Sequence, residues 1–385
     1  MKTINYIIFF SIFFAVYGLV NYYIYIRGLH SIPQNSSYRN YYIPIFLFIS
    51  LAFITGRLLE RVWTSPLSDA LIWIGSFWLG AMLYFVLILL CIDILRLVNH
   101  FVTIFPSFIT ANYAQAKQYA AYSTTLLVGI LILVGSINAR SPRINALNLT
   151  VSKKVDREQL LNIVMVSDIH LGTIIGKHKF DKIVDIINSL NPDLVLFPGD
   201  IVDEDVASII NDNVGESFKR IKSKYGIFAC TGNHEYISGV EESCSFLLKN
   251  GIMVLRDTNV LVNNSIYLIG REDRMVRRLS NKSRKSFPEL LQNIDNNFPI
   301  IVMDHQPFDL DETAKYGIDL QLSGHTHNGQ LWPLNYIAEK IYEVSWGYLK
   351  KGDTHFYVSC GVGTWGPPVR LGNTPEIVNI KLKFN

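Results

Sequence analysis

The strongest constraint on this chain is a long apolar run near its N-terminus. Residues 4–26 contain no charged side chain. A helix of about 20 residues, at 1.5 Å per residue, crosses the hydrocarbon core of a bilayer, which is about 30 Å thick. The run is too long for a signal peptide and is not followed by a small-residue cleavage pattern. We therefore expect it to span a membrane.

Three further apolar runs follow at residues 41–55, 70–90 and 119–137. The first of these is the shortest and contains Pro44. Buried core helices are a poor alternative, because four runs of this composition leave almost no polar face. The sequence therefore predicts a bundle of about four transmembrane helices in residues 1–140.

The distribution of basic residues bears on the orientation of this bundle. An even number of spans puts both chain ends on one side, together with Lys2, Arg57, Arg61, Arg140 and Arg143. The opposite side holds Arg27, Arg39, Arg96 and Lys117. The excess of basic residues on the side of the chain ends favours an integral cell-membrane protein whose C-terminal domain is cytoplasmic. If residues 41–55 did not span the membrane, the predicted orientation would be reversed.

The composition changes after the fourth run, where charged residues return to an ordinary density. The net charge is only +3, and no cluster of Lys and Arg has aromatic residues between its members, so we expect no nucleic acid partner. The four cysteines have no metal-knuckle spacing, which favours free thiols. Residues 141–158 are typical of a linker, with a first strand near 144–151. A second domain then covers residues 159–385, and its oligomeric state is left open.

This second domain alternates strands and helices. Buried strands are predicted at 162–166, 193–197 and 225–230, and helices at 180–190 and 205–222, which is an α/β pattern. Later strands are expected at residues 253–255, 260–262, 266–269, 299–303, 319–322, 356–359 and 377–382, with a helix near 287–294.

Five of these strands end in polar loops that are rich in Asp and His. The candidates are Asp168, His170, Asp200, Asn233, His234, His305, His325 and His327. Ligands bind beyond the carboxyl ends of strands in α/β sheets, so such loops converge. Carboxylate, amide and imidazole groups are ligands for divalent cations, and one Asp can bridge two cations about 3.5–4 Å apart. Each motif alone is a weak signal, whereas the ordered set is a strong one.

At these motifs the chain resembles the calcineurin-like metallophosphoesterases. The match covers about residues 160–382. It rests on Asp168-Ile169-His170, Gly199-Asp200-Ile201-Val202-Asp203, Gly232-Asn233-His234-Glu235, His305 and Gly324-His325-Thr326-His327. Gly329-Gln330, Gly361-Val362-Gly363, Arg370 and Pro375-Glu376-Ile377 are similar to a branch of membrane-associated phosphodiesterases, which includes the transmembrane proteins with a metallophosphoesterase domain. Asn328 stands where that branch usually has glycine.

The resemblance implies a four-layer α/β fold, a β-sandwich flanked by helices, and two divalent cations (Mn, Fe or Zn). It implies that Asp168, His170 and His327 hold one cation, that Asn233, His305 and His325 hold the other, and that Asp200 bridges them. His234 would protonate the leaving oxygen, with Asp203 orienting its ring. The implied activity is hydrolysis of phosphate mono- or diesters.

The membrane anchor favours a lipid-linked or nucleotide-linked phosphodiester substrate, and membrane lipids as partners. The branch includes enzymes that act on UDP-diacylglucosamine. Aromatic residues in 331–365 either rim an opening for an acyl chain or fill the core. The basic segment 271–285 either meets anionic headgroups or is a solvated face.

Two alternatives belong to other classes. The first is a membrane-tethered metal-binding scaffold or sensor without turnover, which is disfavoured because every expected ligand and His234 are present. The second is a soluble-type serine/threonine phosphatase, which would have Arg after Asp203, where this chain has Glu204.

Overall fold

The computed structural model describes residues 2–153, 155, 160–203, 206–280 and 282–385. Glu204 and residue 205 therefore lie outside the described residues, as does part of the predicted linker. The chain divides into two compact units. Residues up to 135 form most of the first unit, and residues 136–365 and 369–385 form the second.

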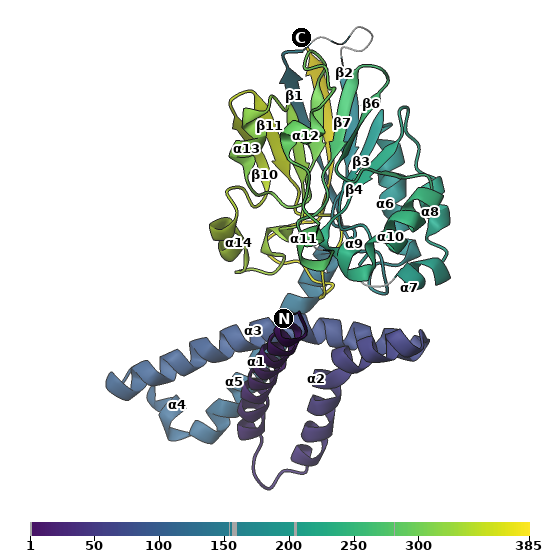
Figure 1. Cartoon of the computed structure of the whole chain (residues 1–385). Coiled ribbons are helices and arrows are strands. Elements are labelled where there is room, and N and C mark those ends of the chain that lie inside the picture. The colour runs from purple at the N-terminus through teal and green to yellow at the C-terminus, as the bar shows by residue number, and fades with distance from the viewer. Residues whose placement is uncertain (1, 154, 156–159, 204–205, 281) are drawn as a thin grey trace. The chain divides into compact units, whose positions relative to one another are not determined.

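The first unit consists of helices (Figure 1). They are α1 (Lys2–Ser31), α2 (Tyr38–Val62), α3 (Pro66–Phe101), the short α4 (Ser107–Ala111) and α5 (Tyr113–Asn138). Within the described residues, four helices, all but α4, are long and apolar enough to cross a membrane, which confirms the prediction of about four spans.

Two local features explain where these helices begin and continue. α2 is longer than the predicted span and runs through Pro44. Pro44 is the seventh residue of α2, inside the helix, where its missing N–H removes one backbone hydrogen bond. α3 begins at Pro66, and the Ser65 side chain caps it by accepting a hydrogen bond from the backbone N–H of Ser68.

The second unit contains two sheets, each of six strands within the described residues. The first sheet has the order β1 (Arg143–Val151), β12 (Glu376–Phe384), β2 (Leu160–Met165), β3 (Leu194–Pro198), β4 (Ile227–Cys230), β5 (Met253–Val254). The second has the order β10 (Gly347–Lys351), β11 (Thr354–Val358), β9 (Leu320–Ser323), β8 (Ile300–Met303), β7 (Ile266–Gly270), β6 (Thr258–Val262). β1 lies in the segment that reads as a linker and pairs along its length with β12, which confirms the strand predicted near 144–151.

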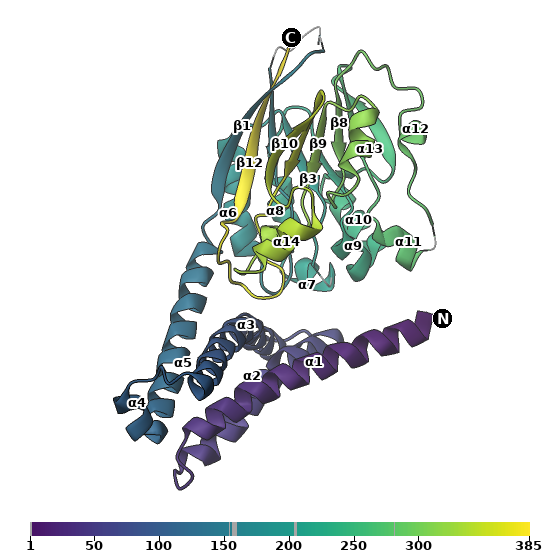
Figure 2. The same ribbon diagram turned by 90° about the vertical axis from the view of Figure 1, so that its left-hand side faces the viewer.

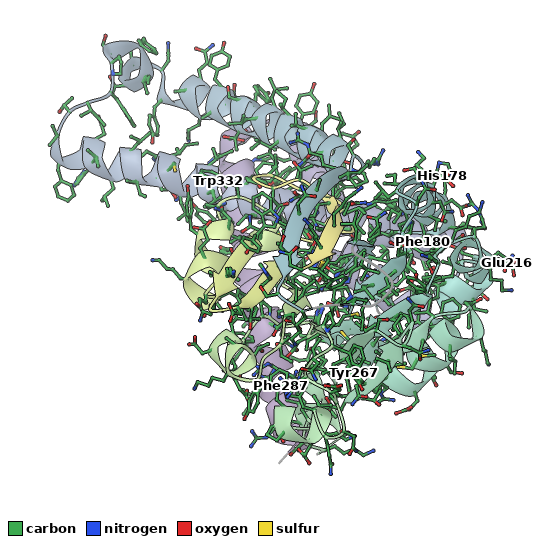
Figure 3. The ribbon with its side chains drawn as sticks, turned by 90° about the horizontal axis from the view of Figure 1, so that it is seen from above. His178, Phe180, Glu216, Tyr267, Phe287 and Trp332 are labelled. Carbon is green, nitrogen blue, oxygen red and sulfur yellow. The ribbon has the colours of Figure 1, made fainter. Side chains whose placement is uncertain are left out.

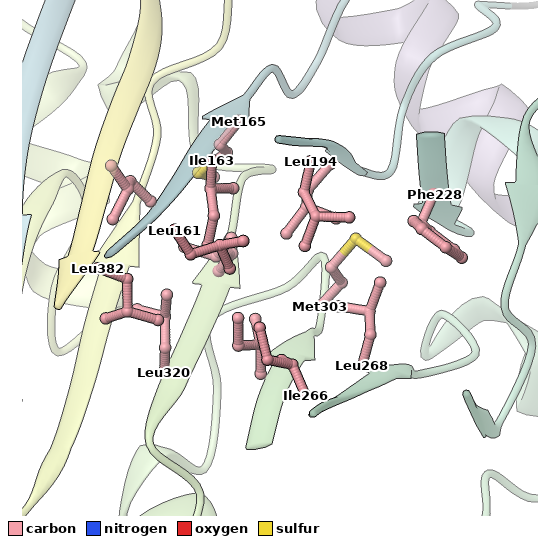
Figure 4. Close-up of a cluster of buried hydrophobic side chains, with 14 of the residues drawn as sticks. Leu161, Ile163, Met165, Leu194, Phe228, Ile266, Leu268, Met303, Leu320 and Leu382 are labelled. Carbon is pink, nitrogen blue, oxygen red and sulfur yellow. The ribbon is translucent and has the colours of Figure 1, made fainter. Parts of the chain in front are cut away.

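The main core lies between the two sheets (Figure 4). On β2, Leu161, Ile163 and Met165 alternate along the strand and therefore share one face. They belong to one cluster with Leu320 of β9 and Met303 of β8, in the other sheet. The sheets thus pack face to face as a sandwich.

Helices lie over the outer faces of this sandwich and along one end of it (Figures 1 and 2). They are α6 (Lys177–Ser189), α7 (Val206–Asn211), α8 (Gly215–Lys219), α9 (Asn233–Ser238), α10 (Val240–Lys249), α11 (Met275–Leu279), α12 (Phe287–Leu290), α13 (Leu310–Lys315) and α14 (Asn335–Ile341). On α6, Phe180 is buried while His178 faces outward (Figure 3). The predicted α/β sandwich flanked by helices is confirmed.

Two details differ from the sequence-based expectation. The single helix predicted over 205–222 is wrong, because α7 and α8 are separate helices. Between them Asn213 has a φ of 54°, a left-handed conformation that ends the helix. Several elements were not predicted: α9, α10, α11 and α13, and also β10 and α14, whose surrounding segment is rich in Gly, Pro and Trp and lacks a clear period.

Candidate metal centre

The polar residues singled out from the sequence follow β2, β3, β4, β8 and β9. Most of them lie in loops, whereas Asn233 and His234 are the first residues of α9 and His327 begins a 3₁₀ turn. β2, β3 and β4 are mutually parallel neighbours, and so are β8 and β9. Their carboxyl ends therefore meet at a common edge of each sheet. Three overlapping groups of potential ligands form there: Asp168 with His170 and His327, Asp200 with His305 and His325, and His170 with Asp203 and His234.

An uncommon backbone conformation accompanies this convergence. Positive φ angles occur at Asp168 (52°), His170 (54°), Asp200 (53°), His325 (72°) and His327 (47°). Residues other than glycine seldom adopt this region, which costs about 1–3 kcal/mol per residue. Such strain is typical of functional sites, because there the surrounding structure holds the backbone in place.

In the first group, three ligand atoms point to one volume. His170 Nε2 lies 3.0 Å from His327 Nε2, which in turn lies 3.5 Å from Asp168 Oδ1. The Asp168 carboxylate is held in place, since it accepts hydrogen bonds from the backbone N–H of His325, at 2.8 Å, and from the hydroxyl of Ser167. Two imidazole nitrogens and a carboxylate oxygen suit a divalent cation.

In the second group, the orientation of His305 is informative. Its Nδ1 lies 2.8 Å from the backbone carbonyl of Pro198, and a carbonyl only accepts, so Nδ1 carries the proton. In the neutral ring, Nε2 then presents a lone pair. It faces Asn233 Oδ1 at 3.2 Å and Asp200 Oδ2 at 3.1 Å. Burial lowers the pKa of His305, but the Asp200 carboxylate raises it well above its ordinary value, so a protonated Nε2 that donates to these oxygens also suits this position. A divalent cation bound to the same three atoms would take the place of that proton.

The third group centres on Asp203. Its Oδ1 lies 3.1 Å from His234 Nδ1 and 3.3 Å from His170 Nδ1. The resemblance implied a partner for His234 only, so the contact with His170 was missed. Because Nδ1 of His170 faces the carboxylate, its Nε2 is directed toward His327. A carboxylate behind a metal-binding imidazole orients the ring in this manner.

The charges of the cluster shift several pKa values. Burial raises the pKa of Asp200, but the positive charges of His305 and His234 outweigh burial and hold this pKa well below its ordinary value. Burial lowers the pKa of His234, but the carboxylates of Asp200 and Asp203 raise it to about 9. Burial is the main reason that the pKa of His325 falls to about 3. At neutral pH, His234 is therefore a proton donor and His325 offers a lone pair.

Glu235 has a role that sequence reasoning missed. Its carboxylate is fully buried and accepts four backbone hydrogen bonds. The donors are the N–H groups of Asp200, Ile201, Val202 and Gly232, at 2.7–2.9 Å. Glu235 thus ties the loop after β3 to the loop after β4. The feature of the sequence that could have pointed to this role is the charged residue directly after His234.

We expect Glu235→Ala to lower the free energy of unfolding of the second unit by about 3–5 kcal/mol, because it leaves four buried N–H groups without an acceptor. Thermal unfolding of the purified full chain measures this. Glu241→Ala is the matched control, since Glu241 is exposed and forms a surface ion pair with Arg256. Equal unfolding midpoints for the two variants would contradict this role for Glu235.

Arg370 is a second residue whose contribution sequence reasoning did not explain. Its side chain is fully buried and donates to the backbone carbonyls of Cys360, Gly361 and Gly363. Its Nη2 also lies 3.3 Å from His327 Nδ1. Arg370 therefore links the loop after β11 to a residue of the first group.

Two glycines are required by close approach to the carboxylates. A Cβ on Gly232 would lie 2.2 Å from Asp200 Oδ1, and a Cβ on Gly324 would lie 2.2 Å from Asp168 Oδ2. Any larger residue at either position would displace the carboxylate that it contacts.

Comparison with known proteins places this site in a family. The family model described as calcineurin-like phosphoesterase matches residues 161–329. A metallophosphoesterase of Aquifex aeolicus is 33% identical over 234 residues, which cover 60% of this chain and 88% of that protein. The chain belongs to the calcineurin-like phosphoesterase family. It is accordingly a metal-dependent phosphoesterase.

Two other relatives of this calcineurin-like chain match more of its length. A transmembrane protein with metallophosphoesterase domain from Danio rerio is 32% identical over 270 residues, covering 67% of this chain and 61% of that protein. A metallophosphoesterase of Campylobacter jejuni is 28% identical over 396 residues, covering 98% of this chain and 99% of that protein. This second similarity therefore includes the first unit, hereafter the membrane unit.

Among solved structures, a dimetal phosphatase from Danio rerio is similar with a TM-score of 0.30 and 12% identity, over 53% of this chain and 88% of that chain. Likeness at this level carries no argument about function.

Proposed function

We propose that this chain is a membrane-anchored hydrolase that uses two divalent cations to cleave a lipid-linked phosphate ester. The observation that carries the two-cation part is the position of Asp200, whose Oδ2 lies 3.1 Å from His305 Nε2 and 3.9 Å from His170 Nε2. Asp200 therefore faces one ligand of each proposed cation. The donor set of oxygens and imidazole nitrogens fits Mn, Fe or Zn.

The proposed roles follow from the groups described above. Asp168, His170 and His327 hold one cation, Asn233, His305 and His325 hold the other, and Asp200 lies between them. Bound cations supply Lewis-acid stabilisation of the phosphoryl oxygens and make water more acidic. His234 donates a proton to the leaving oxygen, which its raised pKa supports, and Asp203 orients its ring.

Exposed aromatic residues support the lipid-linked part of the proposal. Trp365 is 58% exposed, and its ring lies 6.4 Å from that of His234, centroid to centroid. Gln330 fixes the Trp365 backbone through hydrogen bonds at 2.9 and 3.0 Å. Trp332 (labelled in Figure 3) is 51% exposed, whereas Leu331 is buried. The segment therefore contributes to both the core and the surface beside the site.

The basic segment 271–285 does not support headgroup binding as a whole. Arg271 and Arg284 are largely buried, and both pair with Asp304. Arg274 pairs with Asp309. These three arginines hold loops together, which leaves only the exposed cations of the segment for any contact with an anionic surface.

The test measures hydrolysis of two esters by the full chain in the presence of manganese. One ester is a soluble aryl phosphodiester, and the other is a nucleotide-linked diacyl sugar phosphodiester. We expect both to be hydrolysed. Trp365→Ala should lower kcat/KM about tenfold for the lipid-linked ester, because an aromatic anchor of the apolar part is lost. The soluble ester should change little.

Leu248→Ala is the matched control, because Leu248 is an exposed apolar residue on α10. Hydrolysis of the soluble ester alone would contradict the lipid-linked part of the proposal. Inactivity on both esters across several metals would favour the alternative of a scaffold or sensor without turnover.

We also propose that the catalytic unit is cytoplasmic, from the excess of basic residues on the side of both chain ends. A reporter fused after Asn385 and probed in intact cells tests this orientation. Labelling of the reporter from outside the cell would contradict the proposed cytoplasmic location of the catalytic unit.

A further inference from the structure

A cavity of about 620 Å³ lies within the membrane unit. It is lined by parts of all five helices of this unit and mostly by apolar side chains. Phe46 of α2 and Trp78 and Phe85 of α3 are among them. Its volume falls within the range of about 300–1,000 Å³ that is typical of ligand pockets.

Cationic side chains gather in one part of this lining. Arg27 of α1, Arg96 of α3 and Lys117 of α5 all line the cavity, and Asp93 is the only carboxylate among the described residues that do so. The Asp93 carboxylate accepts hydrogen bonds from the guanidinium of Arg27 and from the hydroxyl of Tyr23. Arg96 Nη1 lies 3.3 Å from Asp93 Oδ1. The lining thus retains positive charge after its carboxylate is paired.

The cationic residues of the cavity lie near helix ends, whereas its apolar residues lie toward the middles of the helices. Arg27 and Arg96 lie four and five residues before the ends of α1 and α3, and Lys117 lies four residues after the start of α5. Phe85 lies about 16 Å from Arg96 along α3, at 1.5 Å per residue. Because successive spans cross the membrane in opposite directions, the C-terminal ends of α1 and α3 and the N-terminal end of α5 lie at the same face of the bilayer.

We propose that this cavity binds an anionic phospholipid, with its phosphate headgroup at Arg27, Arg96 and Lys117 and an acyl chain against Phe85 and the neighbouring apolar wall. Basic pockets between membrane helices bind anionic headgroups, and in the four-span topology this pocket lies at the bilayer face opposite both chain ends. Lys and Arg side chains near helix ends extend to the membrane interface, which is where the phosphates of lipid headgroups lie. A zwitterionic lipid would bring a second cation to an already positive site.

This lipid site is separate from the metal centre and does not depend on turnover. The test is native mass spectrometry of the full chain in a neutral detergent with phosphatidylglycerol or phosphatidylcholine of the same acyl chains. We expect phosphatidylglycerol to be retained at about tenfold lower concentration, given the contribution of each cation near a headgroup.

Three variants sharpen the test. The double variant Arg96→Gln with Lys117→Gln should lose the preference for phosphatidylglycerol. Ala120→Phe, which fills the cavity without changing its charge, should weaken retention of both lipids. Arg61→Gln is the control, since Arg61 is exposed on α2 and does not line the cavity.

Equal retention of the two lipids by the wild-type chain would overturn the proposal. So would a preference that survives both the double variant and Ala120→Phe. Thermal unfolding of each variant separates loss of the site from loss of the fold, and Ala120→Phe keeps the test decisive if the double variant does not fold.

Discussion

Replacing Asp200 by Asn in the full chain is expected to abolish phosphoester hydrolysis, with kcat/KM falling by at least about 100-fold. Residues that only support metal ligands already cost about 10–100-fold when they are lost. Asp200 Oδ2 lies 3.1 Å from His305 Nε2 and 3.9 Å from His170 Nε2, so it faces both ligand groups. An amide keeps the shape of this side chain but removes the negative charge that two cations would share. Initial rates on the soluble aryl phosphodiester measure the effect.

The matched control is Asp319→Asn. Asp319 is also buried and paired, with Lys153 at 2.7 Å, but it lies just before β9, at the end of that strand opposite His325. This variant is expected to remain active once folded. An Asp200→Asn variant that keeps activity within tenfold of wild type would show that Asp200 does not bridge two cations.

His234→Ala is expected to retain both cations and to lose about 100- to 10,000-fold in kcat, the usual contribution of a general acid. The imidazole is held by Asp203 rather than by the ligand groups, so its removal leaves the cation ligands in place. The loss should be largest for alkyl esters, whose leaving oxygen needs a proton. It should be smallest for nitrophenyl esters, whose leaving group departs as a stable anion.

Metal analysis and a series of leaving groups check this prediction together. Asp203→Asn serves as the comparison, because it disturbs the rings of both His170 and His234. Loss of metal from His234→Ala would assign the residue to cation binding. An equal loss for all leaving groups would contradict its role as an acid.

The membrane spans and the strand ends of the site could be predicted because their signals are local. Length and hydropathy alone define α1 or α3, and the motif around Asp168 directly follows the apolar residues of β2. The helix break at Asn213 could not be predicted, since Asn occurs both inside helices and in left-handed turns.

Other parts of the site depend on contacts between distant residues. The buried carboxylate of Glu235 accepts hydrogen bonds from backbone N–H groups more than thirty residues earlier in the chain. Arg370 contacts His327, which also lies far earlier in the chain. No periodic pattern encodes such contacts. The cavity in the membrane unit is similar, because Arg27, Arg96 and Lys117 are far apart in sequence and only the packing of the helices brings them together.

The most direct test of the account is a metal titration of the full chain after chelation. Manganese is added in known equivalents, and bound metal and hydrolysis of the aryl phosphodiester are measured on the same samples. The account predicts two bound cations per chain and activity that rises with the second equivalent. Full activity with a single bound cation, or with none, would contradict it.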